Sequence, residues 1–133
     1  MTQYAKQMAA VLFGGALGAV CRVECGRAVM EVMGGVFPLG ILAVNMLGSF
    51  LLGLFTGAVS RSGRRVPTLT AFVSTGFFGG FTTFSSFALD TVTLWGADHA
   101  IYALLNVMVN TTLCTALAGL GWVLCAPRRS DRA

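Results

Sequence analysis

Charged residues are scarce in this sequence. Lys, Arg, Asp and Glu together make up 11% of the 133 residues, whereas an ordinary soluble domain has about 25%. Hydrophobic residues account for 56%, and the mean hydropathy is +0.78. A soluble fold with so little charge would expose large apolar patches and aggregate. The composition therefore predicts a protein whose apolar surface faces lipid.

Groups that bind metals or catalyse reactions are also few. The one histidine, His99, adjoins Asp98 in a predicted loop, where an exposed side chain is expected. Cys21 and Cys25 would share a helix face, but no His or further Cys lies near them, which favours buried small side chains over a metal site. The sequence contains no nucleophile–base pair and no nucleotide-binding motif, so it predicts neither an enzyme nor a coupling cofactor. The net charge of +4 comes without a basic face bearing stacking groups, which argues against nucleic-acid binding.

Four apolar stretches follow one another along the chain. A helix needs about 20 apolar residues to cross the hydrocarbon core, and the first stretch reaches this length only if it continues past Arg22, Glu24 and Arg27. Gly14 and Gly18 have the four-residue spacing that lets helices approach closely in lipid. We predict an all-α membrane protein of one domain, 1–133, with spans at about 8–30, 38–60, 67–89 and 100–125.

The first stretch has a second interpretation. Lys6 followed by an apolar run has the outline of a cleaved signal peptide. The segment 19–21 is a poor cleavage site, however, and the glycine pattern continues in the later spans, so we favour a retained helix.

Glycines interrupt the third stretch. The segment 75–83 contains Gly76, Gly79 and Gly80, and such a run supports a helix poorly. In lipid, the freed backbone groups must be satisfied or line a polar cavity, and helices broken at mid-membrane bind ions through half-helix ends and carbonyls. A glycine-rich packing kink is the alternative. We predict a third helix that is broken at mid-membrane.

Aromatic rings and hydroxyls follow the predicted break. Phe84 and Phe87 are three residues apart and so share a helix face. The edge of an aromatic ring is electropositive, and ring edges together with hydroxyl protons suit a small anion stripped of water. The neighbouring hydroxyls belong to Thr82, Thr83, Ser85 and Ser86. A plain apolar core would also use Phe, so the pair alone does not decide the function.

Polar side chains recur inside two other spans. Asn45 lies within the second, and Tyr102, Asn106 and Asn110 recur at four-residue spacing in the fourth. Such groups face the bundle interior or a water-filled path; interhelical hydrogen bonding is the simpler alternative. Arg22 is the one charge deep within a span, and we expect it to serve at a vestibule or in a structural ion pair.

Together these segments resemble the Fluc fluoride channels, also called the CrcB family. The resemblance covers 14–19 with Arg22, 37–40 with 44–50, and 76–87. It implies an antiparallel dimer with two narrow pores through which fluoride leaves the cytoplasm passively, which protects the cell against fluoride toxicity. The partners implied are fluoride, membrane lipid, and a second subunit that is either the same chain or a paralogue.

The resemblance also implies roles for individual residues. Phe84 and Phe87 would present ring edges to fluoride, and Asn45 would donate its amide. A structural sodium ion at the dimer centre would be held by the backbone carbonyls of Gly79 and Thr82. The pore residues expected are Asn45, Phe84, Phe87, Ser85, Tyr102 and Asn110. Three residues depart from the family pattern, namely Ser86 (more often Thr), Asp90 (Glu is expected) and Asn110 (a small hydroxyl residue is common), so the pore roles of the last two stay open.

Two other classes of membrane protein also have four short spans. A small multidrug exporter needs a membrane-embedded acid, and Glu24, the only candidate, lies late in its span. A non-transporting assembly subunit would not need a polar row beside a broken helix. Fluoride efflux from liposomes separates both from a channel.

Basic residues are concentrated on one side of the predicted bundle. With four spans, both termini and the segment 61–65 share a side, which carries Lys6, Arg61, Arg64, Arg65, Arg128, Arg129 and Arg132. The other side has at most Arg27. The positive-inside rule therefore predicts an inner-membrane protein with cytoplasmic termini. A chain inserting in one orientation would need a paralogous partner of opposite orientation. A homodimer stays open because three of the arginines lie in the tail.

Overall fold

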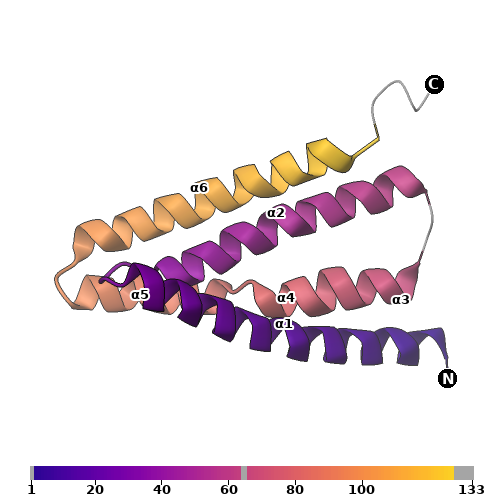
Figure 1. The fold of residues 1–133 in the computed structure, drawn as a ribbon, viewed down its shortest axis with the longest axis horizontal. Coiled ribbons are helices and arrows are strands. Elements are labelled where there is room, and N and C mark those ends of the chain that lie inside the picture. The colour runs from indigo at the N-terminus through magenta and orange to yellow at the C-terminus, as the bar shows by residue number, and fades with distance from the viewer. Residues whose placement is uncertain (1, 64–65, 128–133) are drawn as a thin grey trace.

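The computed structural model describes residues 2–63 and 66–127, and the elements in these ranges are helices (Figure 1). They are α1 (Gln3–Met33), α2 (Leu39–Ser62), α3 (Pro67–Thr70), the π-helix η1 (Ala71–Phe78), α4 (Gly79–Phe81), α5 (Phe84–Gly96) and α6 (Ala100–Cys125). Within the described residues there is no strand, which confirms the predicted all-helical fold.

Three of these helices, α1, α2 and α6, are long and apolar enough to cross a membrane. The third crossing is built from shorter pieces, in which α3, η1 and α4 follow one another without a gap. Thr82 and Thr83 then have extended backbones, with φ, ψ of −81°, 157° and −151°, 120°, before α5 begins. The helix predicted to be broken is therefore interrupted at these two threonines.

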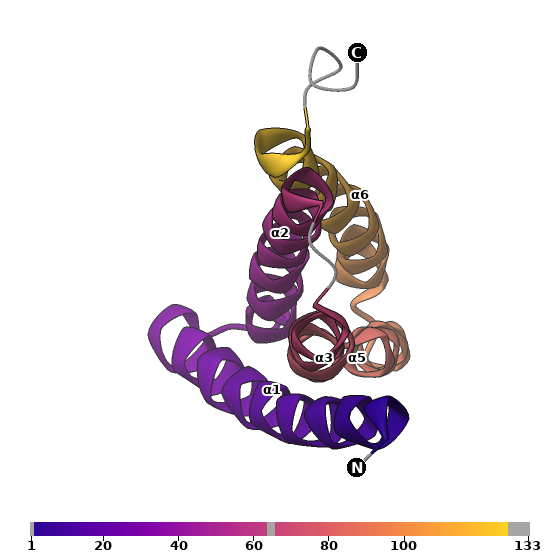
Figure 2. The same ribbon diagram turned by 90° about the vertical axis from the view of Figure 1, so that its right-hand side faces the viewer.

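The third crossing lies between α1 on one side and the paired α2 and α6 on the other (Figure 2). The start of α1, the end of α2, the start of α3 and the end of α6 lie together at one end of the bundle (Figure 1). This is the arrangement that the basic-residue argument assumed. Of the basic residues it used, Lys6 and Arg61 are described, while Arg64, Arg65, Arg128, Arg129 and Arg132 lie outside the described residues.

The glycines of the third crossing do not break it, which corrects the expectation from sequence. Gly76 belongs to η1, and Gly79 and Gly80 belong to α4. Their missing side chains serve packing instead, because a Cβ at Gly80 would collide with the backbone of Gly15 on α1. A Cβ at Gly18 would likewise collide with the Phe77 carbonyl. The glycines let two backbones touch, and the π-helical turn keeps the chain helical through them.

A small apolar core lies directly beside the break. Val44 of α2 packs with the buried Phe78 and Phe81, and Cys21 of α1 packs partly buried against them. This supports the interpretation of Cys21 as a small apolar side chain. Within the described residues no group of three or more His, Cys, Asp or Glu comes together. The core fixes α2 against the end of α4, which brings Asn45 to the interruption.

The close approach of α1 to the third crossing predicts the effect of a single methyl group. We expect Gly18→Ala to destabilise the protein by about 1–3 kcal/mol, the usual cost of overpacking, when thermal unfolding is followed in detergent. Gly119→Ala on α6 is the matched control, because a Cβ there meets nothing within 4 Å and alanine favours the helix. Equal melting temperatures for the two variants would contradict this packing.

Candidate functional site

A polar cavity of about 270 Å³ opens at the interruption of the third crossing. Its lining comes from α2, the interruption, α5 and α6, and comprises Asn45, Ser49, Thr82, Thr83, Phe84, Phe87, Asn110, Thr111, Cys114 and Thr115. Among these described residues none is charged. The cavity therefore offers hydroxyl, amide and ring-edge groups, which can interact with an anion without binding it as a fixed positive charge would.

Four of the six predicted pore residues line this cavity: Asn45, Phe84, Phe87 and Asn110. Ser85 lies one side chain away, with its Oγ 3.2 Å from Thr83 Oγ1. The ring of Tyr102 instead packs edge-on against Phe37, with the ring centroids 6.2 Å apart, and it is not part of the lining. The sequence also failed to single out Ser49 and Cys114. Only packing of α2 against α6 brings these two together, since nothing in their spacing indicates it.

The carboxamide of Asn45 stabilises the interruption by pairing with the backbone of Thr83. The Thr83 N–H donates to Asn45 Oδ1 at 2.8 Å, and Asn45 Nδ2 donates to the Thr83 carbonyl at 3.1 Å. One side chain thus satisfies both backbone groups of a residue that has left the helix, as the interior of a membrane requires. Asn45 is only 9% exposed. We call this pair of bonds the Asn45–Thr83 clasp.

The interruption leaves backbone carbonyls without their helical donors, and those of Gly79 and Thr82 are among them. In a continuous α-helix, the Thr83 N–H would donate to Gly79 and the Ser86 N–H to Thr82. The Thr83 N–H goes to Asn45 instead, and the Ser86 N–H donates to Thr83 Oγ1 at 3.1 Å, which caps α5. Gly79 and Thr82 are the positions that the family resemblance assigns to sodium. Carbonyl oxygens freed in this way are suitable ligands for a small hard cation.

Three asparagines connect the clasp to α5 by way of α6. Asn45 Nδ2 donates to Asn110 Oδ1 at 3.2 Å, and Asn110 Nδ2 donates to Asn106 Oδ1 at 2.8 Å. Asn106 Nδ2 then donates to Thr91 Oγ1 at 2.9 Å. We call this series the amide relay. The four-residue spacing of Asn106 and Asn110 is visible in the sequence. The residues at which the amide relay ends, Thr83 and Thr91, are set by tertiary contacts and could not be read from that spacing.

The two phenylalanines of α5 differ greatly in exposure. Phe87 is 7% exposed, whereas Phe84 is 78% exposed. Their ring centroids lie 5.4 Å apart with an angle of 61° between the planes, so one ring presents its edge toward the other. Apart from its contact with Phe87, the Phe84 ring is left exposed by the residues that the structure describes. The cavity wall is therefore incomplete on the side of Phe84.

Arg22 lies away from this cavity, in the wall of a second one of about 380 Å³ that also contains Arg27, Ser86 and Asp90. Glu24, one of the partners considered for Arg22, instead forms an ion pair with Arg27 at 2.6 Å. Asp90 Oδ2 is buried without a hydrogen-bond partner among the described residues. Arg22 and Asp90 thus line one shared space.

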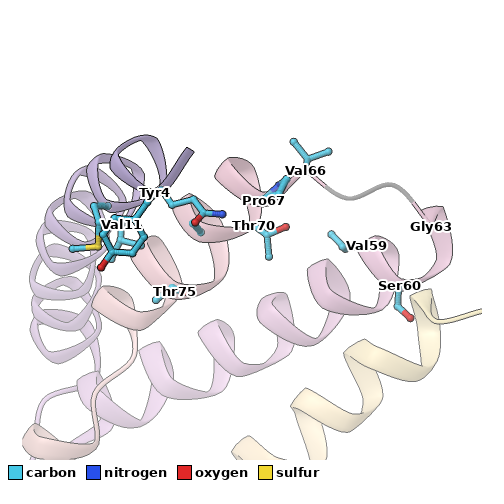
Figure 3. A pocket seen from close by; sticks show the side chains of 12 residues that line it. Tyr4, Val11, Val59, Ser60, Gly63, Val66, Pro67, Thr70 and Thr75 are labelled. Atoms are coloured by element: carbon cyan, nitrogen blue, oxygen red, sulfur yellow. The ribbon is translucent and has the colours of Figure 1, made fainter. Parts of the chain in front are cut away.

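A larger groove, of about 650 Å³, lies elsewhere (Figure 3). It runs between the N-terminal part of α1, the start of the third crossing and the end of α2, where Tyr4, Pro67 and Val59 line it. None of its 12 lining residues, all of them described, is charged, and none is among the predicted pore residues. Its size alone does not make it the site.

Comparisons with known proteins agree with these features. Residues 9–122 match the profile of the family described as CrcB-like protein, Camphor Resistance (CrcB). A protein of Magnetococcus marinus named fluoride-specific ion channel FluC is 41% identical over 118 residues, covering 89% of this chain and 96% of the relative. Proteins of the same name from Rhizobium johnstonii and Citrifermentans bemidjiense are each 38% identical, covering 83% and 87% of this chain and 90% and 94% of the relatives.

The clasp predicts a large effect of changing Asn45. Asn45→Leu keeps the volume but leaves the Thr83 N–H and carbonyl unpaired, and each buried unpaired group costs about 1–3 kcal/mol. We expect a clear fall in the melting temperature of the purified protein in detergent. Thr56→Val is the control, because the hydroxyl that it removes donates only to carbonyls of its own helix. We expect little change in its melting temperature. A melting temperature for Asn45→Leu within error of that control would show that the clasp does not hold the interruption.

Proposed function

This chain belongs to the CrcB-like protein family, and we propose that it is a subunit of a fluoride-specific ion channel through which fluoride leaves the cytoplasm passively. The family is one of channels rather than enzymes. The observation that carries the proposal is the uncharged polar cavity at the interruption, walled by hydroxyls, amides and two aromatic rings. Passive efflux would protect the cell against fluoride toxicity.

The chemistry of the cavity suits fluoride. This ion holds its water tightly, so a pore must replace the hydration shell with many donors of moderate strength, favourable enough for entry and weak enough for exit. Thr111 and Thr115 donate to carbonyls of their own helix at 2.7 and 2.6 Å, and a hydroxyl can rotate to donate elsewhere. The edges of Phe84 and Phe87 add positive potential without a formal charge.

The exposed ring of Phe84 supports a second subunit at the pore. A two-fold pair is the commonest soluble assembly, and in the family architecture implied by the resemblance the two subunits are antiparallel. In such a dimer the projecting Phe84 of each chain would be covered by the other, and the incomplete cavity walls would close into two pores. We therefore assign the pore to Asn45, Phe84, Phe87 and Asn110, with Ser85 beside it.

The freed carbonyls of Gly79 and Thr82 support a structural sodium ion at the centre of this dimer. Both belong to the interruption, and both lose their helical donors to side chains, as described above. Two antiparallel copies would bring two such carbonyl pairs toward one axis, where a cation would satisfy them in the absence of water. Arg22, at the wall of the second cavity, would attract fluoride at a vestibule.

The ring edges of Phe84 and Phe87 predict a loss of transport when they are removed. Liposomes that contain the purified wild-type channel, either this chain alone or this chain with its paralogous partner, should release fluoride without a proton gradient. Phe84→Ile and Phe87→Ile keep apolar bulk but lose the ring edge, a contribution of about 0.5–1.5 kcal/mol, so we expect efflux to fall by up to about tenfold. Phe13→Ile, at a ring that is 75% exposed on α1, is the control. Wild-type rates in both Ile variants, with intact dimers, would remove these rings from the pore.

The charge distribution predicts the orientation of the chain. Lys6 belongs to the start of α1 and Arg61 to the last turn of α2, and these two helix ends lie at the same end of the bundle as the end of α6 (Figure 1). Basic residues favour the cytoplasm. We propose insertion in one orientation in the inner membrane, with cytoplasmic termini and a paralogous partner of opposite orientation. Ser62→Cys, in a chain whose four cysteines are replaced by alanine, should react with an impermeant maleimide only from the cytoplasm. Comparable labelling from both sides, with fluoride flux from this chain alone, would instead establish a homodimer.

A further inference from the structure

The amide relay uses every amide proton of its three asparagines. The three carboxamides have six N–H bonds, and the structure records six acceptors for them. Asn45 donates to the Thr83 carbonyl and Asn110 Oδ1, Asn110 to the carbonyl and Oδ1 of Asn106, and Asn106 to the Phe87 carbonyl and Thr91 Oγ1. Fluoride can therefore gain an amide proton from the relay only by displacing an oxygen that already accepts it.

The direction of the relay is fixed at both ends. At one end the Thr83 N–H can only donate, so Asn45 must turn Oδ1 toward it. At the other end the Thr91 hydroxyl donates to the Phe87 carbonyl at 2.8 Å, so its oxygen accepts from Asn106 Nδ2. Reversing any one carboxamide would place two donors or two acceptors face to face. The relay therefore has a single satisfied orientation.

Asn106 is the residue that transmits this orientation to the pore. It is 1% exposed and does not line the pore cavity, so it cannot contact the ion itself. Its Oδ1 accepts from Asn110 Nδ2 at 2.8 Å, which turns Asn110 Oδ1 toward Asn45. Without Asn106, Asn110 has no side-chain acceptor that keeps its oxygen on that side.

We propose, on the basis of the channel function proposed above, that Asn106 is a positioning residue that keeps Asn110 Oδ1 in competition with fluoride for the Asn45 amide proton. When fluoride enters, the Asn45 N–H that donates to Asn110 Oδ1, at an N···O distance of 3.2 Å, donates to the ion instead. When fluoride leaves, the same N–H donates to Asn110 Oδ1 again. The exchange of one acceptor for another keeps the net affinity low, which a conducting site requires.

The proposal predicts that loss of the Asn106 side chain raises the affinity of the channel for fluoride and lowers its maximal efflux rate. Asn106→Leu removes the Oδ1 acceptor and leaves Asn110 only the backbone carbonyl of residue 106. Asn110 Oδ1 is then held less firmly toward Asn45, so the Asn45 N–H becomes more available to the ion. The half-saturating fluoride concentration should fall by about three- to tenfold, the size of one neutral hydrogen bond. The maximal efflux rate should fall as well, because the ion leaves more slowly.

The experiment measures fluoride efflux from liposomes holding the purified protein over a range of internal fluoride concentrations. Wild-type protein, Asn106→Leu and Thr91→Val are compared, the last removing the anchor of the relay at its far end. Thr112→Val is the matched control, since that hydroxyl donates only to the Met108 carbonyl of its own helix and lies outside the cavity. In the Asn110→Ala background, Asn106→Leu should cause no further change in half-saturation, because its effect passes through Asn110.

The outcomes separate this proposal from the channel function itself. Absence of fluoride flux from the wild-type protein, both alone and together with its paralogous partner, would contradict the channel. Suppose instead that the wild type conducts and that Asn106→Leu has a reduced maximal rate but an unchanged half-saturating fluoride concentration. Asn106 would then have only a structural role, and the proposal would be overturned. If Asn106→Leu does not assemble, Thr91→Val decides in the same way, and an unchanged half-saturation in that variant overturns the proposal. An equal shift in Thr112→Val would also overturn it.

Discussion

The arrangement of the site depends on one pair of hydrogen bonds, between the carboxamide of Asn45 and the peptide groups of Thr83. A helix cannot stop inside a membrane unless its freed N–H and C=O groups find partners. The clasp supplies them from a neighbouring helix, and three features follow from it. The Gly79 carbonyl loses its donor, Thr83 becomes the cap of α5, and α5 begins where Phe84 and Phe87 face the cavity.

The close contact between α1 and the third crossing makes the clasp possible. Gly14, Gly18 and Gly80 remove the side chains that would hold the two backbones apart, and the buried Phe78 and Phe81 then fill the space toward Val44 of α2. Asn45 follows Val44 directly and so meets the interruption. The glycines that seemed from the sequence to break the helix therefore do not interrupt it. They allow the close packing that positions the helix ending at Phe81.

Much of this could be predicted from sequence because the membrane leaves few choices. Long uncharged stretches must become helices, and polar residues such as Asn45 and Asn110 within them must face inward. What could not be predicted is connectivity across helices. Local propensity placed the interruption at the glycines, whereas tertiary hydrogen bonds place it at Thr82 and Thr83. Tyr102 shares the spacing of the asparagines but packs on Phe37 instead, because its large ring finds an apolar neighbour near the start of α6.

The most direct test of the central claim is a high-resolution structure of the assembled protein in a lipid nanodisc, prepared in sodium fluoride. The account predicts that the Asn45 carboxamide bridges the N–H and carbonyl of Thr83, with an ion held by the carbonyls of Gly79 and Thr82. It also predicts that Phe84 is covered by the second subunit. A continuous helix through Thr82 and Thr83, or an interruption whose backbone groups pair elsewhere, would contradict it.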